Sequence, residues 1–203
     1  MAHSQIELTP RAAFADLPIT APGSGVVVQE RDELGIASVL ARRGQHEALT
    51  KRVRERFGIE LSPGPRRSAA GGCAFIATGP GAWIVTVERA SNGCVTSLTD
   101  ALGDLAAISD QSDGQAVLRV SGPKAREALC KIVPIDLHPR IFRSGAVAAT
   151  VAAHVGATLW RLDDDPSGHA VFEIAVFRSL AESFWRALSE SAAEFGVRMN
   201  GRG

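Results

Sequence analysis

The chain has 203 residues, of which 45% are hydrophobic and 22% charged, which is typical of a globular protein and excludes disordered and fibrous classes. Twenty-two Lys and Arg residues balance twenty-two Asp and Glu residues, so a dedicated nucleic-acid or membrane-surface binder is disfavoured. Three widely spaced cysteines, no secretory signal and no run of about 18 apolar residues predict a reduced, cytoplasmic protein without a membrane partner.

The first 25 residues differ in composition from the rest of the chain. Residues 1–25 carry three prolines and two glycines with no sustained hydrophobic period, which predicts an extended N-terminal arm outside the core. From residue 26 to residue 203 we expect a single α+β globular unit. Its two halves are predicted at approximately 26–112 and 113–203, joined without a flexible linker.

The first half alternates short apolar runs with two amphipathic segments. Strands are predicted at 26–30, 34–40, 73–78, 82–88 and 106–109. Leu49, Val53 and Phe57 recur every four residues, which predicts a surface helix over 45–57 that ends at Gly58. A second helix is predicted from Val95 to Leu105.

The second half repeats a similar order of elements. Strands are predicted at 116–120, 147–155, 157–162 and 170–177. A helix should begin after Pro123 and end by Val133, because Pro134 disfavours helical geometry in the residue before it. The last helix, Leu180 to about Phe195, should bury a stripe at helical spacings, which is Leu180, Phe184, Leu188, Ala192 and Phe195. The predicted fold is therefore two ferredoxin-like, split βαβ halves packed as one unit.

Glycine-rich and acidic segments invite phosphate-binding or metal-binding interpretations. Gly71-Gly72 and Gly79-Pro80-Gly81 match no phosphate-binding spacing and are interpreted as turns. Asp163, Asp164, Asp165 and His169 contain metal-ligand chemistry, but Asp-Pro-Ser-Gly is a common turn sequence. A solvated hairpin is the favoured interpretation, and no metal or cofactor site is predicted in the chain.

Candidate nucleophiles and bases do not form a recognisable set in the sequence. Asp136 and His138 lie close together without a nucleophile beside them, and Cys130 is predicted on the buried side of its helix. His154 is predicted as a hydrogen-bonded structural histidine on a strand. No catalytic residue is predicted. Of the three tryptophans, Trp185 follows the buried Phe184 and is the preferred candidate for a partner interface.

Several segments carry a resemblance to one family. They are Asp110–Leu129, Pro134–Pro139, Arg42–Gln45, Gly79–Trp83 and Phe177–Arg186. These segments resemble the gamma subunit of bacterial heterotetrameric sarcosine oxidase, and more distantly the Ser121-Gly122-Pro123 region looks like the folate-binding domain of the glycine-cleavage T-protein family. The resemblance implies that family's α+β fold. It covers the chain from Val26 to Gly196.

The resemblance also implies a function. The family's assembly oxidises sarcosine to glycine and passes the one-carbon unit to tetrahydrofolate, with FAD, FMN and NAD held by other subunits. This chain would then be a non-catalytic subunit that packs mainly on the alpha subunit, with beta and delta subunits as further partners. Asp113 stands where a His is common in the family, and the segment Val155–Trp160 lacks the acid of the related aminomethyltransferases.

Two alternatives remain open at this stage. The chain is alternatively a stand-alone module that binds tetrahydrofolate or acts like an aminomethyltransferase. A small-molecule regulatory module is a further possibility that the fold alone allows.

Overall fold

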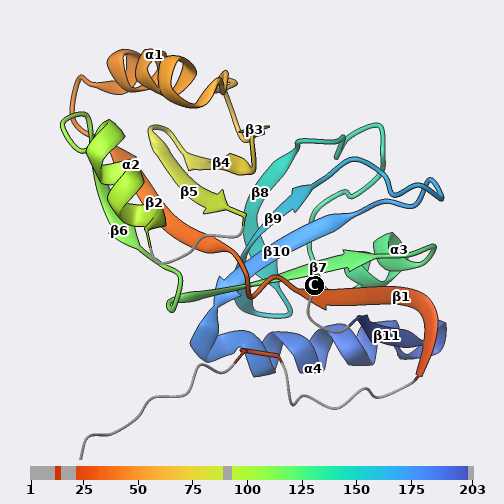
Figure 1. Ribbon diagram of the computed structural model, residues 1–203. Helices are drawn as coiled ribbons and strands as arrows, with labels where there is room; N and C mark the ends of the chain where they lie inside the picture. Colours follow the sequence, from red (N-terminus) through yellow and green to blue (C-terminus); the bar gives the residue numbers. More distant parts are fainter. Residues whose placement is uncertain (1–11, 15–21, 89–92, 201–203) are drawn as a thin grey trace, which may run out of the picture.

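The computed structural model describes residues 12–14, 22–88 and 93–200, and these form two β-sheets with two main helices beside each (Figure 1). The five-stranded sheet has the order β3-β4-β5-β2-β6. Its strands are β2 (Gly35–Ala41), β3 (Arg67–Ala70), β4 (Cys73–Gly79), β5 (Ala82–Val87) and β6 (Ala106–Asp110). Helices α1 (His46–Phe57) and α2 (Cys94–Leu102) cover one face of this sheet. Apart from the added edge strand β3, this is the ferredoxin-like order that the sequence predicts.

The six-stranded sheet has the order β11-β1-β7-β10-β9-β8. Its strands are β1 (Pro22–Glu30), β7 (Gln115–Ser121), β8 (Val147–Ala152), β9 (Val155–Arg161), β10 (Phe172–Phe177) and β11 (Val197–Asn200). Helices α3 (Ala125–Cys130) and α4 (Ala181–Ala192) cover its outer face. Strand β1 runs parallel to β11 and antiparallel to β7, so the N-terminal strand belongs to the sheet of the second half.

The order of layers is helices, sheet, sheet, helices, with three groups of buried side chains between them. One group lies between α1, α2 and the five-stranded sheet, and one between α3, α4 and the six-stranded sheet. The third joins the inner faces of the two sheets and includes Ile36, Ile76, Val117 and Trp160. The two halves are therefore packed face to face through their sheets.

A main-chain connection also joins the two sheets at one edge. Arg66 pairs with Ala146 in an isolated antiparallel bridge, and the N–H of Val147 donates to the carbonyl of Pro65 at 3.0 Å. Phe14, from the expected N-terminal arm, is fully buried, and the N–H of Phe14 donates to the carboxylate of Glu30 at 3.0 Å. This part of the arm packs on the core.

Three local predictions differ from the structure. The predicted strand 147–155 is two strands, because Ala153 and His154 both have positive φ and form the turn between β8 and β9. Helix α2 ends before Leu105, which is buried beyond it. Strands β3 and β11 are short, at four residues each, and give no clear period in the sequence.

Candidate functional site

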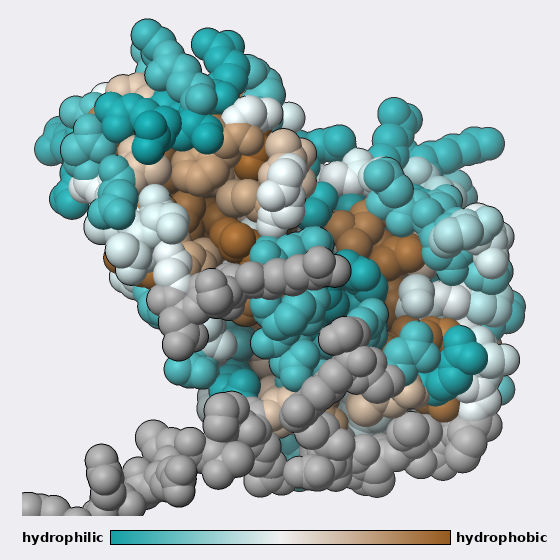
Figure 2. All heavy atoms as spheres, viewed as in Figure 1, coloured by the Kyte–Doolittle hydropathy of each residue, from teal (hydrophilic) through white to brown (hydrophobic). Residues whose placement is uncertain are grey.

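A large open groove lies on the first half of the chain. It has a volume of about 1000 Å³ and lies between α1, the loop 61–65 and the β4–β5 hairpin. Its lining is mostly apolar, and Figure 2 shows this hydrophobic hollow beside α1 with hydrophilic side chains around it. A concave, mostly apolar surface of this size suits a bound ligand or a segment of a partner.

An aromatic pair lies in this groove. The imidazole of His46, at the start of α1, stacks on the indole of Trp83 from β5, with ring centroids 5.7 Å apart and planes 18° apart. Trp83 also makes an edge contact with Phe75 at 6.5 Å. Its side chain is 6% exposed, so Trp83 forms the floor of the groove while His46 is exposed at its edge. These contacts give Trp83 both a core and a surface role.

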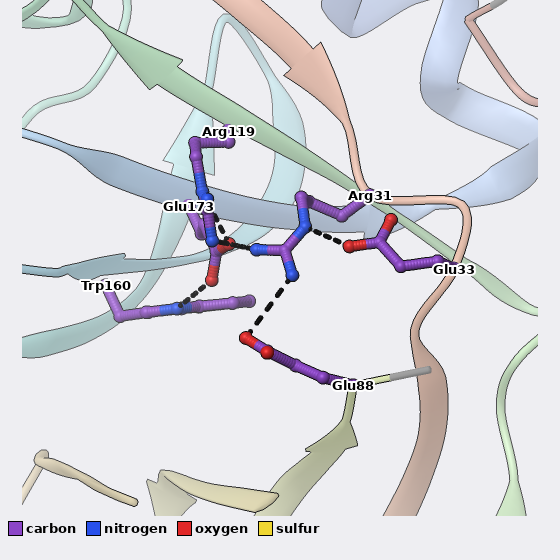
Figure 3. Close-up of polar contacts among 6 residues, drawn as sticks. All are labelled: Arg31, Glu33, Glu88, Arg119, Trp160 and Glu173. Carbon is purple, nitrogen blue, oxygen red and sulfur yellow. Dashed lines mark hydrogen bonds and ion pairs between the residues drawn. The ribbon is translucent and has the colours of Figure 1, made fainter. Parts of the chain in front are cut away.

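A second feature is a buried polar network between the two sheets (Figure 3). Glu173 on β10 is 4% exposed, and its Oε1 accepts hydrogen bonds from Arg31 and from Arg119 on β7, the latter at 2.7 Å. Its Oε2 accepts from the indole N–H of Trp160 on β9 at 2.8 Å. Arg31 lies just after β1 and also contacts Glu33 at 2.5 Å and Glu88 at 3.5 Å.

The electrostatics of this network keep Arg31 charged. Burial by itself acts to lower the pKa of the Arg31 guanidinium, but the negative charges of Glu173 and Glu33 and their hydrogen bonds raise that pKa above its ordinary value. A buried ion pair gains stability only when its hydrogen bonds are satisfied, and here both oxygens of Glu173 have donors. The network therefore positions the two sheets, and the carboxylate of Glu173 is already engaged by hydrogen-bond donors.

The acidic turn that contains Asp163, Asp164 and Asp165 makes structural contacts. Asp164 pairs with Arg161 at 2.5 Å, and the hydroxyl of Ser144 donates to Asp163 at 2.5 Å. The N–H of His169 donates to Asp165, which lowers the pKa of that carboxyl, and the two side chains lie 3.4 Å apart. Within residues 12–14, 22–88 and 93–200, no group of three or more His, Cys, Asp or Glu side chains is arranged to hold a metal ion.

Three other sequence predictions are wrong. Trp185 is 2% exposed and belongs to the core beneath α4, because Ala181, Trp185, Leu188 and Ala192 repeat at helical spacings of four, three and four. Cys130 is exposed at the last residue of α3, not buried. His154 is exposed in the β8–β9 turn and is not a buried strand histidine.

The remaining candidate residues do not converge. Asp136 accepts a hydrogen bond from the N–H of His138 at 2.8 Å within an exposed turn, and His138 accepts one from the N–H of Arg140 at 3.2 Å. His3 lies outside the described residues. Sequence reasoning missed Arg31 and Glu173, since they are 142 residues apart and no local pattern connects them. The signal of this pair in the sequence is that Glu173 is a charged residue within the apolar run 170–177.

Comparison with known families gives one match that covers most of the chain. Residues 43–194 match the model described as "Sarcosine oxidase, gamma subunit family". A sarcosine oxidase subunit gamma from Arthrobacter sp is 33% identical over 130 residues, which are 64% of this chain and 62% of that protein. An aminomethyltransferase from Bacteroides thetaiotaomicron is 32% identical over 120 residues, which are 58% of this chain and 30% of that protein.

Solved structures agree on the fold. A chain of the heterotetrameric sarcosine oxidase from Corynebacterium sp. U-96 superposes with a TM-score of 0.76 at 24% identity, covering 95% of this chain and 99% of that chain. The glycine cleavage system aminomethyltransferase T from Bartonella henselae gives 0.62 at 11% identity, covering 88% of this chain and 48% of that chain. These similarities confirm the predicted α+β fold with two sheets. No helix in the described part of the chain is long and apolar enough to cross a membrane.

The Glu173 network predicts a large loss of stability when one partner is removed. Glu173→Leu leaves the buried guanidinium of Arg31 without its main counter-charge, so the free energy of unfolding should fall by about 3–5 kcal/mol in urea titrations. The exposed pair Lys51–Glu55 is the control, and Glu55→Ala should cost less than about 0.5 kcal/mol. Equal losses in the two variants contradict this role of Glu173.

Burial predicts unequal reactivity of the cysteines. Burial raises the pKa of the Cys73 thiol to about 11, so at pH 8 about one molecule in a thousand carries its thiolate. Iodoacetamide at pH 8 should label the exposed Cys130 first and Cys73 only after unfolding, as read by peptide mass spectrometry. Labelling of Cys73 in the folded chain at the rate of Cys130 contradicts this assignment.

Proposed function

Because the chain belongs to the sarcosine oxidase gamma subunit family, we propose that it is a non-catalytic subunit that packs on the alpha subunit of a heterotetrameric sarcosine oxidase. In this proposal the assembled complex, which also contains beta and delta subunits, oxidises sarcosine to glycine and passes the one-carbon unit to tetrahydrofolate. The gamma chain contributes shape and rigidity. We further propose that the complex is cytoplasmic, and that residues 26–203 form one globular unit, with part of the preceding arm packed on its core.

The groove beside α1 is the observation that supports this role. An apolar hollow of about 1000 Å³ with an aromatic floor is costly to leave in water and is the kind of surface that a partner covers. Arg42, Lys51 and Arg54 stand at its edge among apolar lining residues, which resembles the polar rim and apolar centre of protein interfaces. We therefore assign the alpha subunit to this groove.

The polar groups of the chain support a structural role over a catalytic one. Burial raises the pKa values of Cys73 and Cys94, which disfavours the thiolate that a nucleophile needs. Glu173 is held between two guanidiniums and an indole N–H. These contacts are those of groups that stabilise a fold, not of groups poised to transfer protons.

The glycine-rich turns do not fit a dinucleotide or flavin phosphate. Gly71-Gly72 joins β3 to β4, and Gly79-Pro80-Gly81 joins β4 to β5, so neither turn leads into a helix N-terminus. In this proposal FAD, FMN and NAD are held by other subunits. No step of the reaction is assigned to residues of this chain.

A pair of variants on one helix tests the assigned surface. Thr50 lines the groove, so Thr50→Trp fills it and should weaken binding of the purified alpha subunit by at least about tenfold, about 1.4 kcal/mol, in a surface-immobilised assay. Ala48 is exposed on α1 outside the groove, and Ala48→Trp adds the same bulk there. It should leave the dissociation constant within about twofold of the original.

The outcomes of this experiment distinguish an error in the assigned binding surface from an error in the proposed assembly role. If both variants bind the alpha subunit as the original chain does, the groove is the wrong surface. If the original chain binds no alpha subunit at all, the assembly role itself is wrong. Equal melting temperatures of the two variants confirm that a loss of binding is not a loss of folding.

The similarity to aminomethyltransferases favours one alternative, a stand-alone module that binds tetrahydrofolate. The structural role predicts that calorimetric titration of the full-length chain with tetrahydrofolate gives a dissociation constant weaker than about 100 µM. Binding in the low micromolar range, about −8 kcal/mol, supports the alternative. Formation of a methylene adduct by the chain alone would add the transferase activity to it.

A further inference from the structure

A second hollow lies between the two sheets, on the opposite face of the five-stranded sheet from the groove. It has a volume of about 240 Å³ and is lined by residues of β3, β4 and β5, by Arg31 and by Glu173 of β10. Arg67 pairs across the sheet with Ile76, whose side chain lies in the core between the sheets. Since paired residues share a face, Arg67 points toward the six-stranded sheet.

Arg67 is the unusual group in this cavity. Its Nε is buried and has no hydrogen-bond partner among the described residues. A buried nitrogen of a guanidinium without an acceptor costs free energy, and such atoms are rare in folded proteins. By contrast, Arg31, which lines the same cavity, contacts three carboxylates. Arg67 therefore presents a buried N–H donor at the cavity for which the described residues supply no acceptor.

Glu88 offers the complementary charge at the same cavity. It follows β5, two residues after Thr86 and so on the same face of that strand, and both residues line the hollow. Only Oε1 of Glu88 contacts Arg31, at a long 3.5 Å (Figure 3). The side chain of Glu88 is 54% exposed. Within the described residues, Oε2 has no hydrogen-bond donor. One carboxylate oxygen thus remains available to accept a hydrogen bond from a cation.

The formal charges around the cavity balance. Two guanidiniums and two carboxylates line it: Arg31, Arg67, Glu88 and Glu173. A bare anion or a bare cation bound in this confined space therefore leaves a net charge, which is costly where water is partly excluded. A ligand that carries one positive and one negative group leaves no net charge in the cavity.

The size of the cavity restricts the ligand further. A volume of about 240 Å³ is below the roughly 300–1,000 Å³ of pockets for drug-sized ligands. Much of the wall is made of small residues, which are Ala69, Ala70, Gly71, Gly72 and Ala74. The wall thus leaves room for a ligand of a few heavy atoms and presents little apolar surface to a long side chain.

From these observations we propose that the inter-sheet cavity binds a small zwitterionic amino acid, with its carboxylate on the guanidinium of Arg67 and its ammonium group on the carboxylate of Glu88. The carboxylate supplies the acceptor that Arg67 Nε lacks, in the forked geometry that guanidiniums favour. The ammonium group supplies the donor for Glu88. This binding needs no partner subunit, so it is independent of the proposed assembly role.

The test is calorimetric titration of the full-length chain with glycine, acetate and methylammonium as separate probes. Glycine should bind at least about tenfold more tightly than either single-charge probe. Arg67→Gln and Glu88→Gln should each weaken glycine binding at least about tenfold. Arg66→Gln is the matched control, because the neighbouring Arg66 is exposed and donates to the carbonyl of Ser144. It should leave glycine binding unchanged.

Each outcome decides the proposal. No measurable glycine binding up to about 10 mM overturns it, as does glycine binding that Arg67→Gln leaves intact. Acetate that binds as tightly as glycine overturns the role of Glu88 and with it the zwitterion. A circular dichroism melt of every variant identifies those that fail to fold. For a variant that does, Arg67→Lys and Glu88→Asp replace the glutamines, and each should weaken glycine binding while keeping its charge.

Discussion

The structure depends on the buried carboxylate of Glu173, which lies where the two sheets face each other. A charge that is 4% exposed is stable only with counter-charges and donors around it, and here they come from separate parts of the chain. Arg119 and Trp160 belong to the strands on either side of β10, whereas Arg31 lies in the crossover from the six-stranded to the five-stranded sheet. Pairing Glu173 therefore fixes the crossover, and the crossover fixes how the second sheet lies on the first.

This placement gives the five-stranded sheet two different faces. Successive residues of a strand point to opposite faces, and β4 shows the result. Ala77 lies at the groove beside α1, whereas Ala74 lies at the cavity between the sheets. Trp83 and Thr86 of β5 are divided in the same way. The apolar groove faces outward and suits a protein partner, while the charged cavity lies on the face toward the second sheet, which contributes Glu173 to its lining, and suits a small polar molecule.

Much of the fold could be predicted from the sequence because its elements have clear periods. Helix α1 follows from the spacing of Leu49 and Val53, and it ends at Gly58, whose φ of 66° is left-handed. The sequence predicts Trp185 near the surface because it follows Phe184, whereas α4 buries a wider stripe that contains both residues. Leu180, predicted in the buried stripe, precedes α4 and is exposed. The Arg31–Glu173 pair could not be predicted, since a contact across 142 residues depends on how the sheets stack and leaves no local pattern.

The groove and the cavity share the backbone of β4 and β5, so a ligand in one of them acts on strands that also line the other. A hydrogen-bonded pair of strands twists as a unit, so a shift that improves packing on one face changes the spacing of side chains on the other. If occupation of the cavity alters the affinity of the groove for its partner, linkage requires the partner to alter the affinity of the cavity by the same factor. The Glu173 network opposes such shifts, because moving one sheet relative to the other stretches Arg31 away from Glu173 or Glu88. The strength of the Glu173 network thus sets the upper limit on the coupling between binding at the groove and binding at the cavity.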